Sequence, residues 1–110
     1  MAQTKQVVLT TTIKATGAIV ENRFVTFAAA QAKAGEAVLG VAPYNAALGD
    51  VTPVEVVGIA LVEAGGAVTA GTPVGADAQG CAVAGAAKIA GTAMSDAAAA
   101  GDIIRVILKG

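Results

Sequence analysis

The chain has no histidine and no tryptophan among its 110 residues. The absence of histidine excludes Ser-His-Asp triads, Cys-His pairs and the commonest metal ligand. The single serine, Ser95, and the single cysteine, Cys81, have no local motif that supplies a base, so neither is expected to act as a nucleophile. We interpret Ser95 as a helix cap and Cys81 as a small packed side chain. The sequence therefore predicts a protein that is not an enzyme.

Phosphate-binding and calcium-binding motifs are also incomplete. Gly35 and Gly40 have the spacing of a P-loop, but Val41 and Ala42 stand where lysine and serine or threonine are required. The acidic residues are scattered and form no DxDxDG calcium loop: Glu21, Glu36, Asp50, Glu55, Glu63, Asp77, Asp96 and Asp102. We expect no cofactor and no metal, and a pair of catalytic carboxylates stays an open alternative.

Charged and aromatic residues are scarce, at 14% and 3% of the chain, and the net charge is −1. A nucleic-acid-binding face requires clustered lysine and arginine, so no nucleic-acid partner is expected. A core built mostly from alanine and valine buries little area per residue, which favours oligomerisation. One cysteine excludes an intramolecular disulfide.

Neither a signal peptide nor a membrane helix is expected. Gln3, Thr4 and Gln6 stand where a signal peptide would have an apolar segment. The apolar window Val56–Ala76 contains Glu63 near its centre, and its glycines and Pro73 disfavour a helix.

Two segments of the chain resemble each other. Ile13–Phe27 aligns with Val62–Ala76 at a shift of 49 positions, and Gly40–Gly58 aligns with Gly91–Gly110 if one residue is inserted. Two copies are too few for a solenoid. We therefore predict one compact domain with an internal pseudo-repeat, residues 13–58 and 62–110. The alternative is chance similarity between segments rich in alanine and glycine.

The repeat also predicts where glycine is needed. Gly17 and Gly66 align, and we expect both in turns at positive φ, where alanine would cost about 1 kcal/mol. The Gly-Asp pairs 49–50 and 101–102 align as well, and each is predicted to form a structural turn before a strand.

Most of the chain has the pattern of short strands separated by turns. Alternation and β-branched residues predict strands over Val7–Ile13, Arg23–Phe27, Asp50–Val57, Pro73–Ala76 and Asp102–Leu108, with a further strand at Cys81–Ala84. Ala18–Val20 and Ala67–Thr69 are predicted as short extended segments that precede Arg23–Phe27 and Pro73–Ala76 across tight turns. Short helices are predicted at most at Ala28–Val38 and Ser95–Ala100. The fold prediction is a small, mainly β domain over residues 9–110 with two similar halves.

The first eight residues are polar and then apolar and contain no turn signal. We predict that residues 1–8 form a mobile N-terminal arm outside the domain.

The segment from Val8 to Leu108 resembles the capsid cement, or head decoration, proteins of tailed bacteriophages. The phrases that carry the resemblance are KATGAIVENRFV from Lys14, VEAGGAVTAGTPV from Val62, DAQG from Asp77 and AGDIIRV from Ala100. The resemblance implies a β-clip-like or β-tulip-like domain that forms homotrimers. It also implies a structural virion protein, made in the host cytoplasm, that binds the major capsid protein on the exterior of an expanded capsid and stabilises it.

In proteins of this role the N-terminal arm orders against the shell, so the resemblance implies that the arm contacts the capsid. The residues concerned are Ala2, Gln3, Thr4, Lys5, Gln6, Val7 and Val8.

Two other functions stay open. A duplicated small β domain is also the plan of lipoyl- or biotin-carrying domains, for which Lys33 is the candidate modified residue, and mass spectrometry of Lys33 would separate this function from the structural one. The chain could also be a β-module of a larger fibre or enzyme.

Overall fold

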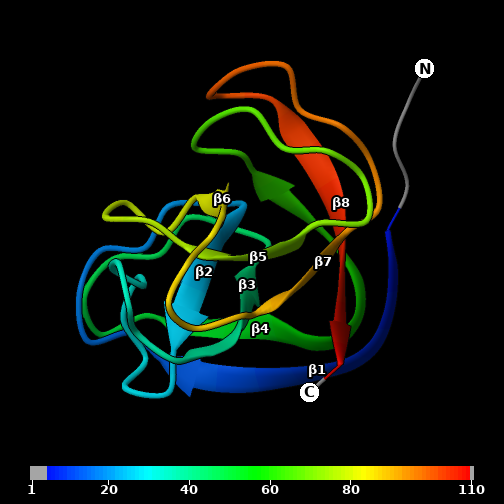
Figure 1. Cartoon of the computed structure of the whole chain (residues 1–110). Coiled ribbons are helices and arrows are strands. Elements are labelled where there is room, and N and C mark those ends of the chain that lie inside the picture. Colours follow the sequence, from blue (N-terminus) through cyan, green and yellow to red (C-terminus); the bar gives the residue numbers. More distant parts are fainter. Residues whose placement is uncertain (1–4, 110) are drawn as a thin grey trace.

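Eight strands form one sheet that curls into a nearly closed barrel (Figure 1). The computed structural model describes residues 5–109. The strands are β1 (Gln6–Lys14), β2 (Arg23–Thr26), β3 (Val38–Ala42), β4 (Val51–Glu63), β5 (Pro73–Ala76), β6 (Ala82–Ala84), β7 (Gly91–Ala93) and β8 (Ile103–Lys109). The strand order is β2-β3-β4-β8-β7-β5-β6, with β1 paired to β4.

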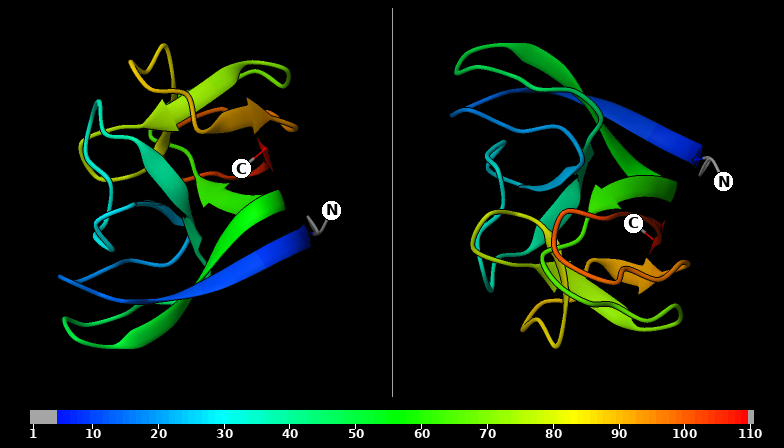
Figure 2. Two further views of the ribbon diagram at one scale, coloured as in Figure 1. Left: turned by 90° about the horizontal axis from the view of Figure 1, so that it is seen from below. Right: turned by 90° about the horizontal axis from the view of Figure 1, so that it is seen from above.

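The long strand β4 organises the sheet. Its first part pairs with β1 from Lys14↔Val51 to Gln6↔Ile59, and its last part pairs with β8 from Val57↔Lys109 to Glu63↔Ile103. All of these pairings are antiparallel. The two views of Figure 2 show β4 bending along its length, so that β1 lies at one end of the barrel and β8 continues the wall.

The mainly β prediction is confirmed. The predicted strands match β1, β2, β5, β6 and β8, and the strand predicted over Asp50–Val57 continues to Glu63. The segments predicted over Ala18–Val20 and Ala67–Thr69 form only isolated bridges, at Ile19 and Val68. Strands β3 and β7 were not predicted. Each contains a glycine, which gives no strand signal.

Between residues 5 and 109 no segment is helical, so the two predicted short helices are absent. In the first, Ala29 has φ 64° and Gly35 has φ 80°, values that a right-handed helix does not allow. In the second, the N–H of Ala97 donates to the carbonyl of Val68, and the Ser95 hydroxyl accepts the N–H of Arg105 instead of capping a helix. Tertiary hydrogen bonds thus override the helix propensity of alanine.

The two halves of the chain make corresponding strand pairings. Strand β2 pairs with β3 as β5 pairs with β7, and β3 pairs with β4 as β7 pairs with β8. The pairing of Thr10–Lys14 with β4 matches the pairing of Ile59–Glu63 with β8, whereas the register shifts between Val7 and Thr10 have no counterpart in the second half. Thr11↔Val54 corresponds to Ala60↔Val106, and Ile13↔Thr52 corresponds to Val62↔Ile104.

The first half therefore consists of β1, β2, β3 and the N-terminal part of β4. The second half consists of the C-terminal part of β4, β5, β7 and β8. The correspondence begins before Ile13, the predicted start of the repeat, and β4 serves both halves.

The turns of the two halves correspond as well. The bridge Ile19↔Ala46 has its counterpart in Val68↔Ala97. At the predicted Gly-Asp turns, Asp50 accepts the N–H of Ala47 and Asp102 accepts that of Ala98, both at 2.8 Å. Gly49 and Gly101 have positive φ of 88° and 95°. Each turn leads directly into a strand, as the sequence predicts.

Each half also has its own small apolar core. The buried residues of the first are Ala15, Ile19, Val25, Ala42, Ala46 and Val54. Their counterparts are Ala64, Val68, Val74, Ala93, Ala97 and Val106, all buried in the larger core. That larger core also contains Phe24, Ala32 and Val41 from the first half. The first half thus covers the core of the second.

Polar contacts join the halves above this core. The guanidinium of Arg23 pairs with the carboxylate of Glu63 at 3.3 Å and donates to the carbonyl of Gln79 at 2.9 Å. The N–H of Glu63 donates to the carbonyl of Asn22. These contacts hold the first residue of β2, Arg23, beside the last residue of β4, Glu63.

The expectation for Gly17 and Gly66 was wrong. Neither has a positive φ, and a Cβ added to either would meet nothing within 4 Å. Gly40 and Gly91, which occupy corresponding positions in β3 and β7, are among the glycines that leave no room for a Cβ. A Cβ on Gly40 would overlap the carbonyl of Glu55, and one on Gly91 would overlap that of Ile107. Glycine is required here by close approach of strands.

Lys5 anchors the beginning of β1 through a buried carboxylate. Its Nζ lies 2.8 Å from Oε2 of Glu55, whose side chain is 9% exposed. Replacing Lys5 with methionine leaves that carboxylate without its cation, and we expect unfolding free energy to fall by about 1–3 kcal/mol. Chemical denaturation would measure the change.

The matched control for Lys5→Met is Lys14→Met, at the exposed other end of β1. This control should change stability by no more than about 0.5 kcal/mol. Equal stability of the two variants would show that the Lys5–Glu55 pair contributes nothing.

Candidate functional site

In the described part of the chain, Asp77, Arg23 and Glu63 lie near the single cysteine, Cys81. Among residues 5–109, no three His, Cys, Asp or Glu side chains lie close enough to share a metal ion. Cys81 is buried, and burial, with a smaller contribution from Asp77, raises the pKa of its thiol above the usual value of 9.0. A thiol in this state is a poor nucleophile.

Lys33, the candidate carrier residue, lies in an exposed turn between β2 and β3. The N–H of Glu36 donates to the carbonyl of Lys33, and the Glu36 carboxylate accepts the N–H of Lys33 at 2.7 Å. Gly35 completes the turn with φ 80°. The turn presents the lysine to solvent, and its modification stays a prediction.

The predicted arm divides into two parts in the structure. Ala2, Gln3 and Thr4 lie outside the described residues. Lys5 forms the ion pair with Glu55, and Gln6 and Val7 pair with Ile59 and Gly58 of β4. Val8 stands at a bulge between the paired residues. The boundary predicted at residue 8 therefore falls inside β1.

Strand β1 is unusually exposed for part of a barrel. Only Val7 and Ile13 are half-buried, and the other seven residues are exposed, including Val8 at 79% and Leu9 at 52%. In the described part of the chain β1 pairs with β4 only, so its outer edge is open. It has neither proline nor charge between Gln6 and Ile13, which are common devices against edge-to-edge pairing. An exposed edge of this kind is suited to contact with another chain.

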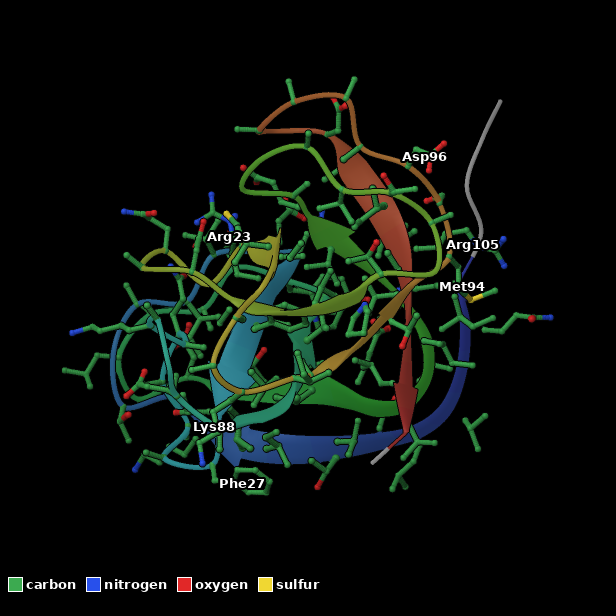
Figure 3. The ribbon with its side chains drawn as sticks, in the orientation of Figure 1. Arg23, Phe27, Lys88, Met94, Asp96 and Arg105 are labelled. Carbon is green, nitrogen blue, oxygen red and sulfur yellow. The ribbon has the colours of Figure 1, made fainter. Side chains whose placement is uncertain are left out.

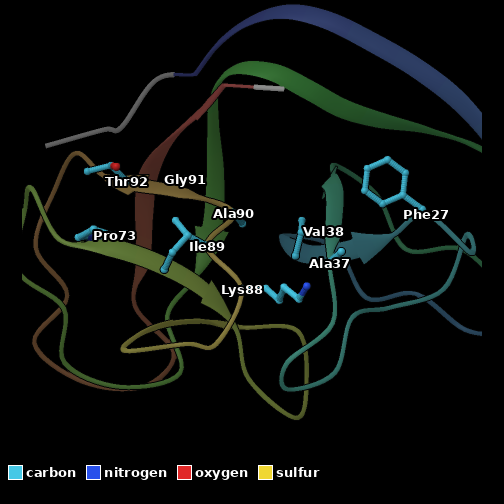
Figure 4. A pocket seen from close by; sticks show the side chains of 9 residues that line it. All are labelled: Phe27, Ala37, Val38, Pro73, Lys88, Ile89, Ala90, Gly91 and Thr92. Carbon is cyan, nitrogen blue, oxygen red and sulfur yellow. The ribbon is translucent and has the colours of Figure 1, made fainter.

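A second candidate surface is a groove of about 630 Å³ between the two halves (Figure 4). One wall contains Phe27 and Val38, and the other contains Pro73, Ile89 and Thr92. Phe27 is 73% exposed and Ile89 is 57% exposed. Figure 3 shows Phe27 projecting away from the ribbon on the side where Lys88 lies. Exposed apolar side chains in a groove mark a surface for binding.

The sequence did not predict the groove. Its residues come from four separated segments, and none of those segments carries a motif. The internal repeat contained one signal for the groove. Pro73 aligns with Phe24, and Thr92 aligns with Val41. Phe24 and Val41 are buried apolar residues, whereas the second half has a proline and a threonine at these positions.

None of the described residues belongs to a helix long and apolar enough to cross a membrane.

Two comparisons with known proteins found similarities. A family model described as "Phage cement protein" matches residues 2–108. Among solved structures, the chain is similar to the head fiber gp8.5 N base of bacteriophage phi29, with a TM-score of 0.76 and 19% identity over 92% of this chain and 93% of that chain. No curated protein matches the sequence. The structural likeness, at this identity, concerns the fold.

Proposed function

The chain belongs to the phage cement protein family, and from this premise we propose that it binds the outer surface of an expanded bacteriophage capsid as a homotrimer and stabilises the shell. The family is one of structural phage proteins, and a capsid-associated, virion location follows from membership. The observation that carries the proposal is the family match over nearly the whole chain. The proposal adds four details to family membership. They are the trimer, the exterior position, synthesis in the host cytoplasm and the major capsid protein as partner.

The mechanism is thermodynamic. A protein that binds the expanded shell and not its alternatives stabilises that shell by mass action, by about 2.7 kcal/mol per site when free protein is at 100 times its Kd. Many copies act on one shell, so modest affinity per copy is sufficient. No chemical step is needed, which suits a chain without histidine.

The N-terminal segment supplies the contact in this proposal. Residues 2–8 lead into or begin β1, whose outer edge is open. An extended segment at such an edge can add to a sheet of the partner through main-chain hydrogen bonds. Ala2, Gln3 and Thr4 precede this strand in the sequence and belong to the capsid contact in this proposal.

The test is binding to purified heads that lack this protein. We expect co-sedimentation with expanded heads but not with unexpanded ones, and a higher melting temperature of the expanded heads. Light scattering of the protein alone should give three times the 10.5 kDa mass of one chain. Equal binding to both kinds of head, or no binding to either, would contradict the proposal.

A second candidate is the base of a head fibre. The similar solved structure is the N base of a head fiber, which favours this alternative. Electron microscopy of decorated heads would separate the two functions. Fibre density rising beyond each attached domain would support a fibre base, and a compact knob alone would exclude it.

A further inference from the structure

We infer that copies of this chain associate when β1 of one copy packs into the groove of another. This contact between chains would repeat the contact that the two halves make within one chain. The inference rests on the self-association in the proposed function and assigns the surfaces that produce it.

The internal contact covers the C-terminal part of β4. Ala60 and Val62, on one face of that segment, are 1% and 0% exposed. The first half supplies part of their cover, because Phe24 of β2 and Val41 of β3 belong to the same buried core. Within the chain, therefore, β2 and β3 of one half lie over the first strand of the other.

The corresponding strand of the first half lacks this cover. The paired registers of β1 and β4 make Thr11 the counterpart of Ala60 and Ile13 the counterpart of Val62. Thr11 is exposed and Ile13 is only half-buried. Ile13 packs against the core of the first half, but this face of β1 has less cover than its counterpart, where Ala60 and Val62 are buried.

The covering surface has an open counterpart as well. Pro73 of β5 and Thr92 of β7 correspond to Phe24 and Val41, and both line the groove. The described residues that line the groove include none from β1. Figure 4 shows the β1 ribbon passing beyond the groove rather than through it. In the described part of the chain, strand β1 thus has no segment packed over it like the one over β4, and the groove wall with Pro73 and Thr92 has no strand packed against it.

When two copies associate, the exposed face of β1 in one copy can pack against the groove of the other. The proposed contact between copies is more polar than the contact within one chain. It has Thr11 where the internal contact has Ala60, and Thr92 where the internal contact has Val41. Each threonine offers a methyl group for packing and a hydroxyl for hydrogen bonds, so this contact is less apolar than the internal one. Because the two surfaces differ, the contact is head-to-tail, and such contacts close into rings when the rotation allows. A ring of this kind is compatible with the proposed trimer.

Cysteine cross-linking tests the assignment. In a Cys81→Ala background, Thr11→Cys and Thr92→Cys are prepared as separate proteins, one with a tag that changes its mass. The two are mixed and oxidised with copper phenanthroline, and products are resolved on a non-reducing gel. Because a disulfide needs Cα atoms within about 7 Å, the heterodimer should form only if these positions face each other. Thr10→Cys mixed with Thr92→Cys is the matched control, since Thr10 is also exposed but lies on the other face of β1.

We expect at least a five-fold higher yield of heterodimer with Thr11→Cys than with Thr10→Cys. Equal yields overturn the inference. Light scattering on the background protein, run in parallel, separates the possible failures. An oligomer without the Thr11–Thr92 cross-link rejects only this assignment of surfaces, whereas a monomer at high micromolar concentration rejects the self-association of the proposed function along with it.

Discussion

Replacing Gly40 or Gly91 with alanine is expected to lower the unfolding free energy by about 2–3 kcal/mol in each case, because both positions are too crowded for a side chain. A Cβ on Gly40 would overlap the Glu55 carbonyl and lie 2.9 Å from Cγ1 of Val54. At Gly91 the same atom would overlap the Ile107 carbonyl and lie 2.9 Å from Cγ1 of Val106. Relief requires adjacent strands to separate. In a domain of this size the melting temperature should fall by roughly 8 °C or more.

The controls for this experiment are Gly17→Ala and Gly66→Ala. Both sites have open space around the missing Cβ and no left-handed backbone. We expect changes within about 0.5 kcal/mol, with the lower entropy of the unfolded chain favouring alanine slightly. Thermal melts of the four variants should therefore separate into two pairs. Different costs at Gly40 and Gly91 would show that the two halves tolerate strain unequally.

Removing residues 2–4 is expected to weaken binding to expanded heads at least tenfold, which corresponds to about 1.4 kcal/mol, while stability stays nearly unchanged. The two effects should separate because the deletion leaves in place the described contacts of this segment with β4, which are the Lys5–Glu55 ion pair and the pairings of Gln6 and Val7. Head binding is measured by co-sedimentation and stability by thermal melts.

A control variant keeps the chain length and changes only the side chains, with Gly-Ser-Gly in place of residues 2–4. It tests whether backbone alone supports the contact. If the deleted protein binds expanded heads as tightly as the full chain, the N-terminal segment is not part of the capsid contact. A deletion through Val8 would not be informative, because it removes paired residues of β1 and the cation beside Glu55.

The sequence predicted those elements whose signal is local. Alternation and β-branched residues identified β1 and β8, and the aligned Gly-Asp pairs identified the turns before β4 and β8. It failed where the signal depends on distant residues. Ala28–Val38 is rich in alanine, yet Ala32 is buried in the core and Ala29 has a positive φ. Strand β7 is only Gly91–Ala93, and close packing against β8 creates it.

For the candidate surfaces too, the sequence predicted features with a local signal and missed features that depend on distant residues. A polar N-terminal segment without turn signals pointed to an arm, but the ion pair between Lys5 and a residue 50 positions away moved its boundary. The exposure of β1 could not be predicted from its own residues, because Val7–Ile13 has an ordinary strand pattern. The groove depends on how two halves meet, and only the mismatch of Pro73 with Phe24 within the repeat hinted at it.

The sharing of β4 between the halves has a consequence for how the molecule loses its structure. A duplicated protein whose copies are joined by a linker can melt one copy at a time. Here the last strand of one copy continues without a break into the first strand of the other, and Val57 pairs with β1 and β8 at once. Neither copy can open without removing a strand from its neighbour, so the chain should unfold in a single cooperative step. For a protein proposed to bind a capsid, this means that no form with only one half unfolded should accumulate before the whole domain unfolds.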